Sequence, residues 1–99
     1  MNALKILESS ANGSYSTEFK SADNLITYRL KIAGSPAAAV KAFLQDKQRE
    51  TNGFFLKVNC SNWNSATVKL QAKTTADGDD FTDTGDNFTR DSLRIFRYQ

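Results

Sequence analysis

Alternation of apolar and polar residues is the clearest pattern along this chain. From Ile26 to Ile32 every second residue is apolar, and polar residues lie between. A period of two is typical of a strand with one buried face, because successive side chains of a strand point to opposite faces. The pattern predicts a strand over Leu25–Ala33. Further strands are predicted at Ala3–Glu8, Tyr15–Lys20, Phe54–Cys60, Ala66–Lys73 and Leu93–Tyr98, and short ones around Phe81 and Phe88.

The segment that follows the strand at Leu25–Ala33 departs from this alternation. Ser35 is a good helix N-cap, Pro36 suits the first helical position, and three alanines follow. Four apolar residues then share one helical face: Ala37, Val40, Phe43 and Leu44. Gly53 stands where a C-cap glycine belongs. We predict a helix of about four turns over residues 36–50. The alternative is a strand over Ala39–Gln45, where the residues also partly alternate.

The spacing of these elements indicates the fold class. Residues 1–99 form one domain by length, and no linker, repeat or low-complexity tract divides them. Turn residues separate the strands: Asn12-Gly13 is a hairpin signal, and Thr84-Gly85-Asp86 is a predicted turn between the strands around Phe81 and Phe88. Six or seven short strands with such turns predict an antiparallel β-sandwich or jelly-roll-like domain with one short α-helix.

Composition argues against catalysis. The chain has no histidine, which removes the Ser-His-Asp and Cys-His arrangements and most catalytic zinc sites. It also has no glycine-rich phosphate loop. The single cysteine, Cys60, cannot form an internal disulfide, and we expect it to be a small buried apolar residue. We therefore predict a protein that is not an enzyme and uses no cofactor.

Charge and hydropathy limit the classes of partner that we expect for this chain. The chain has 13 basic and 11 acidic residues, a formal net charge of +2. A dedicated nucleic-acid binder normally carries a stronger basic excess, so nucleic acid is not an expected partner. No apolar run approaches the roughly 20 residues that span a bilayer, and the N-terminus lacks a signal-peptide pattern. We expect no membrane association. We also expect that the protein is synthesised in a cytoplasm.

Five aspartates crowd into one connection between predicted strands. They are Asp77, Asp79, Asp80, Asp83 and Asp86. Calcium binds oxygen ligands, but an EF-hand loop needs acidic residues at its first, third and fifth positions and a glycine at the sixth. Counting from Asp77, the fifth and sixth positions are Phe81 and Thr82. We therefore predict no metal site and interpret the segment as a solvated hairpin connection.

Five residues are candidates for an interaction surface: Phe55, Trp63, Arg94, Phe96 and Tyr98. Phe55 points away from its core-facing neighbours in the predicted strand. Arg94, Phe96 and Tyr98 share one face of the last strand, a combination that can bind single-stranded nucleic acid, although protection of an edge strand by charge explains the arginine as well. Trp63, in a loop, is either a carbohydrate platform, an interface anchor or a plug at the end of the sandwich.

One part of the chain resembles a known group of proteins. The run Trp63–Ala72, WNSATVKLQA, leads through the Asp-Gly turn of Asp77–Asp83 to Asn87-Phe88-Thr89. This order is similar to a segment of small β-sandwich proteins from tailed-phage virions, which include capsid decoration (cement) proteins and fibre modules. The resemblance covers Phe54–Thr89 and carries no catalytic motif.

The resemblance implies a function and a location. It implies a non-enzymatic virion structural protein, most of all a capsid decoration protein, made in the bacterial host cytoplasm and bound to the major capsid protein. It also implies a homo-oligomer, often a trimer. Two alternatives remain at this point: a binding module for carbohydrate or another host-surface ligand, and a small phage-encoded inhibitor of a host protein.

Overall fold

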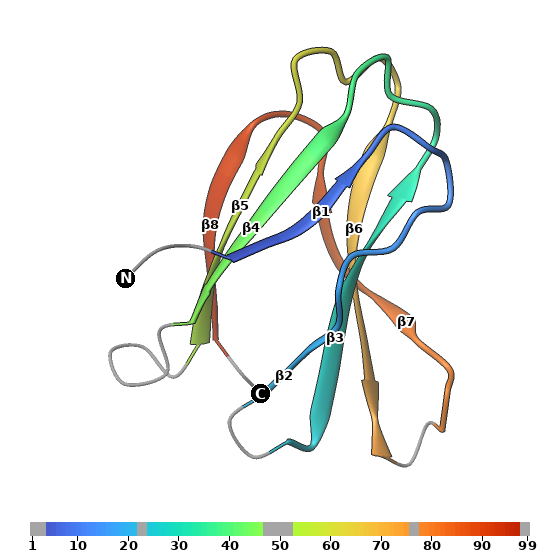
Figure 1. Cartoon of the computed structure of the whole chain (residues 1–99). Coiled ribbons are helices and arrows are strands. Elements are labelled where there is room, and N and C mark those ends of the chain that lie inside the picture. The colour runs from blue at the N-terminus through green and yellow to red at the C-terminus, as the bar shows by residue number, and fades with distance from the viewer. Residues whose placement is uncertain (1–3, 22–23, 47–52, 76–77, 98–99) are drawn as a thin grey trace.

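Two four-stranded antiparallel sheets pack against each other as a β-sandwich (Figure 1). The computed structural model describes residues 4–21, 24–46, 53–75 and 78–97. Sheet 1 has the strand order β1-β4-β5-β8, and sheet 2 has the order β2-β3-β6-β7. The strands of sheet 1 are β1 (Leu4–Ser9), β4 (Val40–Asp46), β5 (Gly53–Asn59) and β8 (Ser92–Arg97). Those of sheet 2 are β2 (Phe19–Lys20), β3 (Ile26–Ala33), β6 (Thr67–Thr74) and β7 (Thr82–Phe88). The predicted class, a mainly β protein, is confirmed.

The chain crosses between the sheets after every odd-numbered strand. As a result β1 pairs with β4, β3 with β6 and β5 with β8, and the two strands between each pair belong to the opposite sheet. This is the connectivity of Greek-key sandwiches. Because non-local pairs hold both sheets, neither sheet is complete without strands from both halves of the chain.

The alternating residues of the predicted strands form the core. The buried apolar side chains of β3 are Tyr28, Leu30 and Ile32. Those of β5 are Phe54, Leu56 and Val58, and Cys60 follows directly after this strand. β6 contributes Val68 and Leu70. An aromatic cluster joins the layers around Phe54. Its ring centroid lies 5.1 Å from that of Phe19, 5.5 Å from that of Tyr28 and 5.2 Å from that of Phe96. Burial of these faces is the main favourable term in folding.

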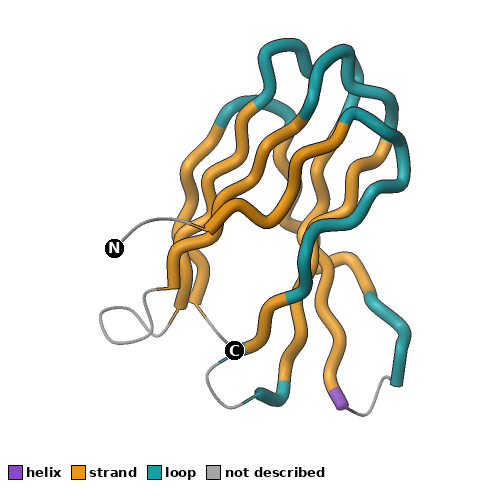
Figure 2. The backbone as a smooth tube through the Cα atoms, in the orientation of Figure 1, coloured by secondary structure: helices purple, strands orange, loops and turns teal. Residues whose placement is uncertain are grey.

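The predicted helix over residues 36–50 is wrong. Residues 36–39 form a loop and Val40–Asp46 is strand β4; residues 47–50 lie outside the described part. The described residues contain no α-helix, and only Thr75, at the end of β6, has 3₁₀ geometry (Figure 2). The alternative strand over Ala39–Gln45 agrees with β4 to within one residue at each end.

Pairing explains why a strand forms here in spite of the helix signals. β4 lies between β1 and β5 and pairs with both, so a helix would leave two ladders without their shared partner. Its inward residues Val40 and Ala42 are 0% exposed. The residues before the strand are fixed by another loop: Ala37 donates its N–H to the Asn62 carbonyl at 3.0 Å. Tertiary contacts therefore override a weak local propensity.

Two predicted turns have other roles. Asn12-Gly13 does not join a pair of adjacent strands; it crosses from sheet 1 to sheet 2, and the Gly13 N–H donates to the Ile32 carbonyl at 2.8 Å. Thr84-Gly85-Asp86 lies inside β7 rather than between two strands. There Gly85 has a φ of 93° and the register with β6 shifts, which is the geometry of a β-bulge. The strand predicted at Tyr15–Lys20 is reduced to the two residues of β2.

Gly53 is the first residue of β5 and not a helix cap. A Cβ at this position would overlap the main-chain carbonyl of Phe96 on β8. The absence of a side chain therefore permits the close approach of the two strands.

Replacing Gly53 with alanine is expected to destabilise the protein by pushing β8 away from β5. Overpacking of this kind costs about 1–3 kcal/mol, and each kcal/mol lowers the melting temperature of a domain of this size by roughly 4–8 °C. Thermal melts check the prediction, with Lys57→Ala on the exposed side of the same strand as the control, expected to change the free energy of unfolding by less than about 0.5 kcal/mol. Equal melting temperatures for the two variants would contradict the packing argument.

Candidate interaction surface

The outer face of sheet 1 carries an exposed apolar cluster at the β8 side. Its members are Phe43 of β4, Phe55 of β5, and Leu93 and Ile95 of β8; together they are called the outer patch. Leu93 is 65% exposed and Ile95 59% exposed, whereas the two phenylalanines are half-buried. Each member lies between residues that face the core, so the alternation that builds the core also turns these side chains outward.

Strand register brings the outer patch together. Phe55 lies directly opposite Ile95, and Lys57 lies between Phe43 on one side and Leu93 on the other. Side chains opposite each other on neighbouring strands are about 4.5–5.5 Å apart at Cβ, and diagonal neighbours are within reach of aromatic side chains. The four residues therefore form one continuous apolar surface with the Lys57 side chain among them.

Positive charge surrounds the outer patch. At the β1 side, Lys5 and Lys41 lie 2.7 and 3.7 Å from the carboxylate of Glu8, whose pKa is lowered first by the hydrogen bond from Lys5. At the β8 side, Lys57 and Arg97 form no ion pair with any described residue. The unpaired charge thus lies beside Leu93 and Ile95, where an acidic partner surface would be favoured.

Arg94 and Phe96, which the sequence analysis placed on a binding face, are turned toward the inside of the sandwich. Phe96 stacks on Phe54 with an interplanar angle of 20°. The Arg94 guanidinium lies 5.2 Å from the ring centroid of Phe88 and 5.1 Å from that of Phe96. These two residues do share one face of β8, but the opposite face, with Leu93 and Ile95, is the one open to a partner. Tyr98 lies outside the described residues.

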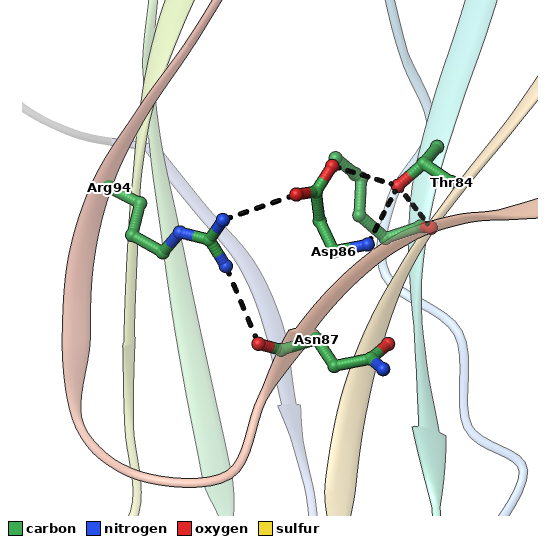
Figure 3. A network of polar contacts seen from close by, with 5 residues as sticks. Thr84, Asp86, Asn87 and Arg94 are labelled. Carbon is green, nitrogen blue, oxygen red and sulfur yellow. Dashed lines mark hydrogen bonds and ion pairs between the residues drawn. The ribbon is translucent and has the colours of Figure 1, made fainter.

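Arg94 links the two sheets at their open side (Figure 3). Its Nη2 donates to Asp86 Oδ1 at 3.1 Å and its Nη1 to the Asn87 carbonyl at 3.4 Å, so that β8 of sheet 1 is joined to β7 of sheet 2. Thr84 Oγ1 lies 3.1 Å from the other carboxylate oxygen of Asp86 and holds it in place. The contact is half-exposed, which limits its contribution to roughly 0–1 kcal/mol.

A groove lies between the sheets beside this link. The sheets diverge toward the lower end of Figure 1, and the groove there has a volume of about 640 Å³. Tyr28, Phe54 and Leu70 are among its apolar lining residues, and Arg94 and Phe96 line it from β8.

Trp63 plugs one end of the sandwich. It lies in the loop between β5 and β6 and packs against the core. Its Nε1 donates to Asp91 Oδ1 at 2.9 Å, and the same oxygen accepts the Cys60 N–H at 3.0 Å. The hydrogen bond from Trp63 is the larger cause of the lowered pKa of Asp91, followed by that from Cys60. Of the three interpretations of Trp63, the packed plug is the one that these contacts support.

Cys60 is buried as predicted. It is 7% exposed, and its Sγ donates to the Ala38 carbonyl at 3.3 Å.

The outer face of sheet 2 has a different character. The guanidinium of Arg29 lies between the rings of Tyr15 and Phe81, 3.8 and 3.9 Å from their centroids. Its Nε donates to Gln71, and Gln71 donates in turn to Asp83 at 2.8 Å, which lowers the pKa of that carboxyl. Polar groups on this face are thus largely occupied by one another. This arrangement was not predicted, because it needs the register of β3, β6 and β7.

The described aspartates of the β6–β7 region do not converge. Asp83 turns to Gln71 and Lys69, and Asp86 turns to Arg94 across the opening. Within the described ranges no three acidic, histidine or cysteine side chains gather as metal ligands. Asp77 lies outside those ranges.

Sequence reasoning found only part of the outer patch. Phe55 was named from its outward direction, but Leu93, Ile95 and Phe43 were missed. In Leu93–Tyr98 both faces contain apolar residues, so alternation alone does not tell which face is inside. The observation that decides this is the pairing of Phe96 with the buried Phe54.

Comparison with known protein families, curated proteins and solved structures gives no match for this chain. In the described residues no helix is long and apolar enough to cross a membrane.

The Asp91 contact predicts a specific acid sensitivity. Because the pKa of Asp91 is lowered in the folded state, its ionised form stabilises the fold above the ordinary carboxyl pKa of 3.8, and this stabilisation is lost as the pH falls through the lowered value. Thermal melts from about pH 5 to about pH 2.5 should therefore fall less steeply for Asp91→Asn and for Trp63→Phe than for the unchanged chain. Parallel curves for all three proteins would show that the contact does not contribute.

Calcium is expected to leave the stability unchanged. A ligand at 100 times its dissociation constant would add roughly 2.7 kcal/mol, which raises the melting temperature of a domain of this size by more than about 10 °C. Melts in millimolar calcium and in excess chelator should agree. A rise of that size that disappears in Asp79→Asn/Asp83→Asn would reveal a site and refute the interpretation of a solvated connection.

Proposed function

We propose that this chain is a non-enzymatic structural protein of a tailed-phage virion, a capsid decoration protein that binds the major capsid protein through the outer face of sheet 1. The observation that carries the proposal is the outer patch, in which Leu93 and Ile95 lie exposed side by side. Exposed apolar clusters of this kind mark interaction sites more often than they occur by chance on a monomer. The resemblance of Phe54–Thr89 to virion sandwich proteins supplies the class of assembly.

The energetics of the outer patch fit a docking role. Complete burial of a leucine or isoleucine side chain contributes roughly 1.5–3 kcal/mol. Phe43 and Phe55, which are half-buried, form the base on which such contacts rest. A few well-buried side chains at the centre of an interface provide most of its affinity, and a charged rim adds specificity. The outer patch combines both kinds of residue, with Lys57 among its apolar side chains and Arg97 at the end of β8.

The carboxylates support a role other than catalysis. General acid chemistry near neutral pH needs a carboxyl group whose pKa is raised. Hydrogen bonds lower the pKa of Asp83 and of Asp91 instead. Both groups serve structural contacts, with Gln71 and with Trp63.

We further propose that the protein acts as a homotrimer on the capsid. A sandwich of 99 residues has a small core, and assembly adds buried area to it. A cyclic trimer uses two different surfaces of each copy, so the outer patch can bind the capsid while other surfaces contact neighbouring copies. Sedimentation that finds only monomer at high micromolar concentration would count against the trimer in solution.

The carbohydrate-binding alternative has less support. It depends on an aromatic ring that is free to stack on a sugar, and its candidates are Trp63, Phe55 and Tyr98. Phe55 is half-buried in the outer patch, and Tyr98 lies outside the described residues. The Trp63 side chain is held by Asp91 and by the core. A small inhibitor of a host protein would use an exposed patch as well, but no feature of the patch favours a host target over a capsid.

Two measurements test the proposed function. Mass spectrometry of purified virions of the encoding phage should detect the chain. Its absence from intact particles would contradict the proposal. In reconstitution with particles that lack the protein, Leu93→Thr/Ile95→Thr should reduce binding at least tenfold, since loss of about 1.4 kcal/mol gives a factor of ten. The melting temperature should stay within a few degrees, because both side chains are exposed.

Leu25→Thr is the matched control for this experiment. Leu25 is 56% exposed, close to the values for Leu93 and Ile95, but it lies just before β3 of sheet 2. Binding should be unchanged in this variant. An equal loss of binding in Leu25→Thr would mean that exposed apolar area in general, and not the outer patch, is responsible.

A further inference from the structure

The four edge strands of the sandwich differ in how they are protected against pairing with another chain. An edge strand presents unpaired N–H and C=O groups, and proteins commonly block them with bulges, very short strands or charge. In β1 the register with β4 shifts at Ile6. β2 is only two residues long. β7 contains the irregularity at Gly85 and two aspartates. Each of these three edges therefore carries a device that hinders strand addition.

β8 is the regular edge. Its six residues pair with β5 in unbroken register, from Ser92 opposite Val58 to Arg97 opposite Gly53. Among the described strands β8 has no partner other than β5. Leu93 and Ile95 project from it on the outer face, where a neighbouring strand would cover them. Arg94 is the protecting charge on the inner face, and it is held by Asp86.

Space for an added strand exists on the inner side of β8. A strand that pairs with β8 would place every second side chain on the outer face beside Leu93 and Ile95, and the others on the inner face. The groove of about 640 Å³ lies on that inner side, and the inward Arg94 and Phe96 of β8 are among its lining residues. Inward side chains of the added strand would therefore enter an existing opening and need no displacement of the core.

We infer that β8 binds an extended, acidic strand of a partner protein by strand addition to sheet 1. Three cations near this edge, Lys57, Arg90 and Arg97, form no ion pair within the described residues, and β8 itself has no carboxylate. Main-chain hydrogen bonds would supply affinity, as in other cases of strand addition, and the side chains would supply selectivity. The fitting partner segment alternates apolar residues, which enter the inner groove, with acidic ones, which lie on the outer face with Lys57 and Arg97.

A second copy of this chain is a poorer occupant of the same edge. Pairing β8 with β8 of another copy would bring two copies of Arg94 and Arg97 together with no carboxylate from either strand. Like charges on directly neighbouring strands are destabilising. The identity of the partner as a capsid protein rests on the proposed function, whereas the capacity of β8 to accept a strand does not.

The experiment extends the full chain after Gln99 with a flexible glycine-serine linker and the strand Thr-Val-Glu-Val-Glu-Val-Thr. Because the linker makes pairing intramolecular, the local strand concentration reaches the millimolar range. Two matched extensions serve as controls, one with lysine in place of both glutamates and one with proline in place of the central valine. Amide hydrogen exchange of Ser92–Arg97 is then followed by two-dimensional NMR.

The acidic extension should slow the fast-exchanging amides of β8 at least tenfold, the lysine extension should slow them less, and the proline extension should leave them unchanged. Equal exchange in all forms would overturn the inference of a strand-accepting edge, and equal protection by the lysine strand would overturn the preference for an acidic partner. If the unextended chain sediments as a dimer with protected β8 amides, the occupant is a second copy. None of these results depends on virions, so failure here is distinguishable from absence of the chain in particles.

Discussion

Packing of Phe54 between the two sheets determines which surfaces this protein presents. Phe54 contacts Phe19 and Tyr28 of sheet 2 and stacks on Phe96 of the neighbouring strand β8. Because Phe96 is drawn inward, the alternation of β8 forces Leu93 and Ile95 outward. A shift of one residue in the β5–β8 register would exchange these faces and remove the outer patch. The outer patch is therefore a direct consequence of one core contact.

The open side of the sandwich follows from the same arrangement. β8 and β7 are joined by a short turn but belong to different sheets, and their edges are not paired with each other. The Arg94 side chain connects them, through the Asp86 carboxylate and the Asn87 carbonyl. A half-exposed ion pair holds two strands less firmly than a hydrogen-bonded ladder does, so β8 and β7 are only loosely joined at this side of the molecule. The regular edge strand β8 and this loose connection between the sheets thus lie together.

Sequence reasoning succeeded where a strand has one buried face and failed where local and distant signals disagree. β3, β5 and β6 could be predicted because their apolar residues alternate without ambiguity. β4 was taken for a helix because Pro36 and the alanines are genuine helix signals, and the competing evidence, pairing with both β1 and β5, is not local. β8 was predicted as a strand with the wrong face outside, because apolar residues occur on both faces. The bulge at Gly85 was predicted as a turn, because a glycine with a left-handed φ is typical of both turns and β-bulges.

The single tryptophan has a consequence for how the molecule can be observed. Trp63 donates its indole N–H to Asp91, which is the residue immediately before β8. Indole emission depends on the polarity and hydrogen bonding around the ring, and the chain contains no other indole to obscure it. Trp63 fluorescence therefore reports on the point at which β8 begins. Separation of β8 from the sandwich would change the Trp63 emission, so it could be followed by fluorescence without any added label.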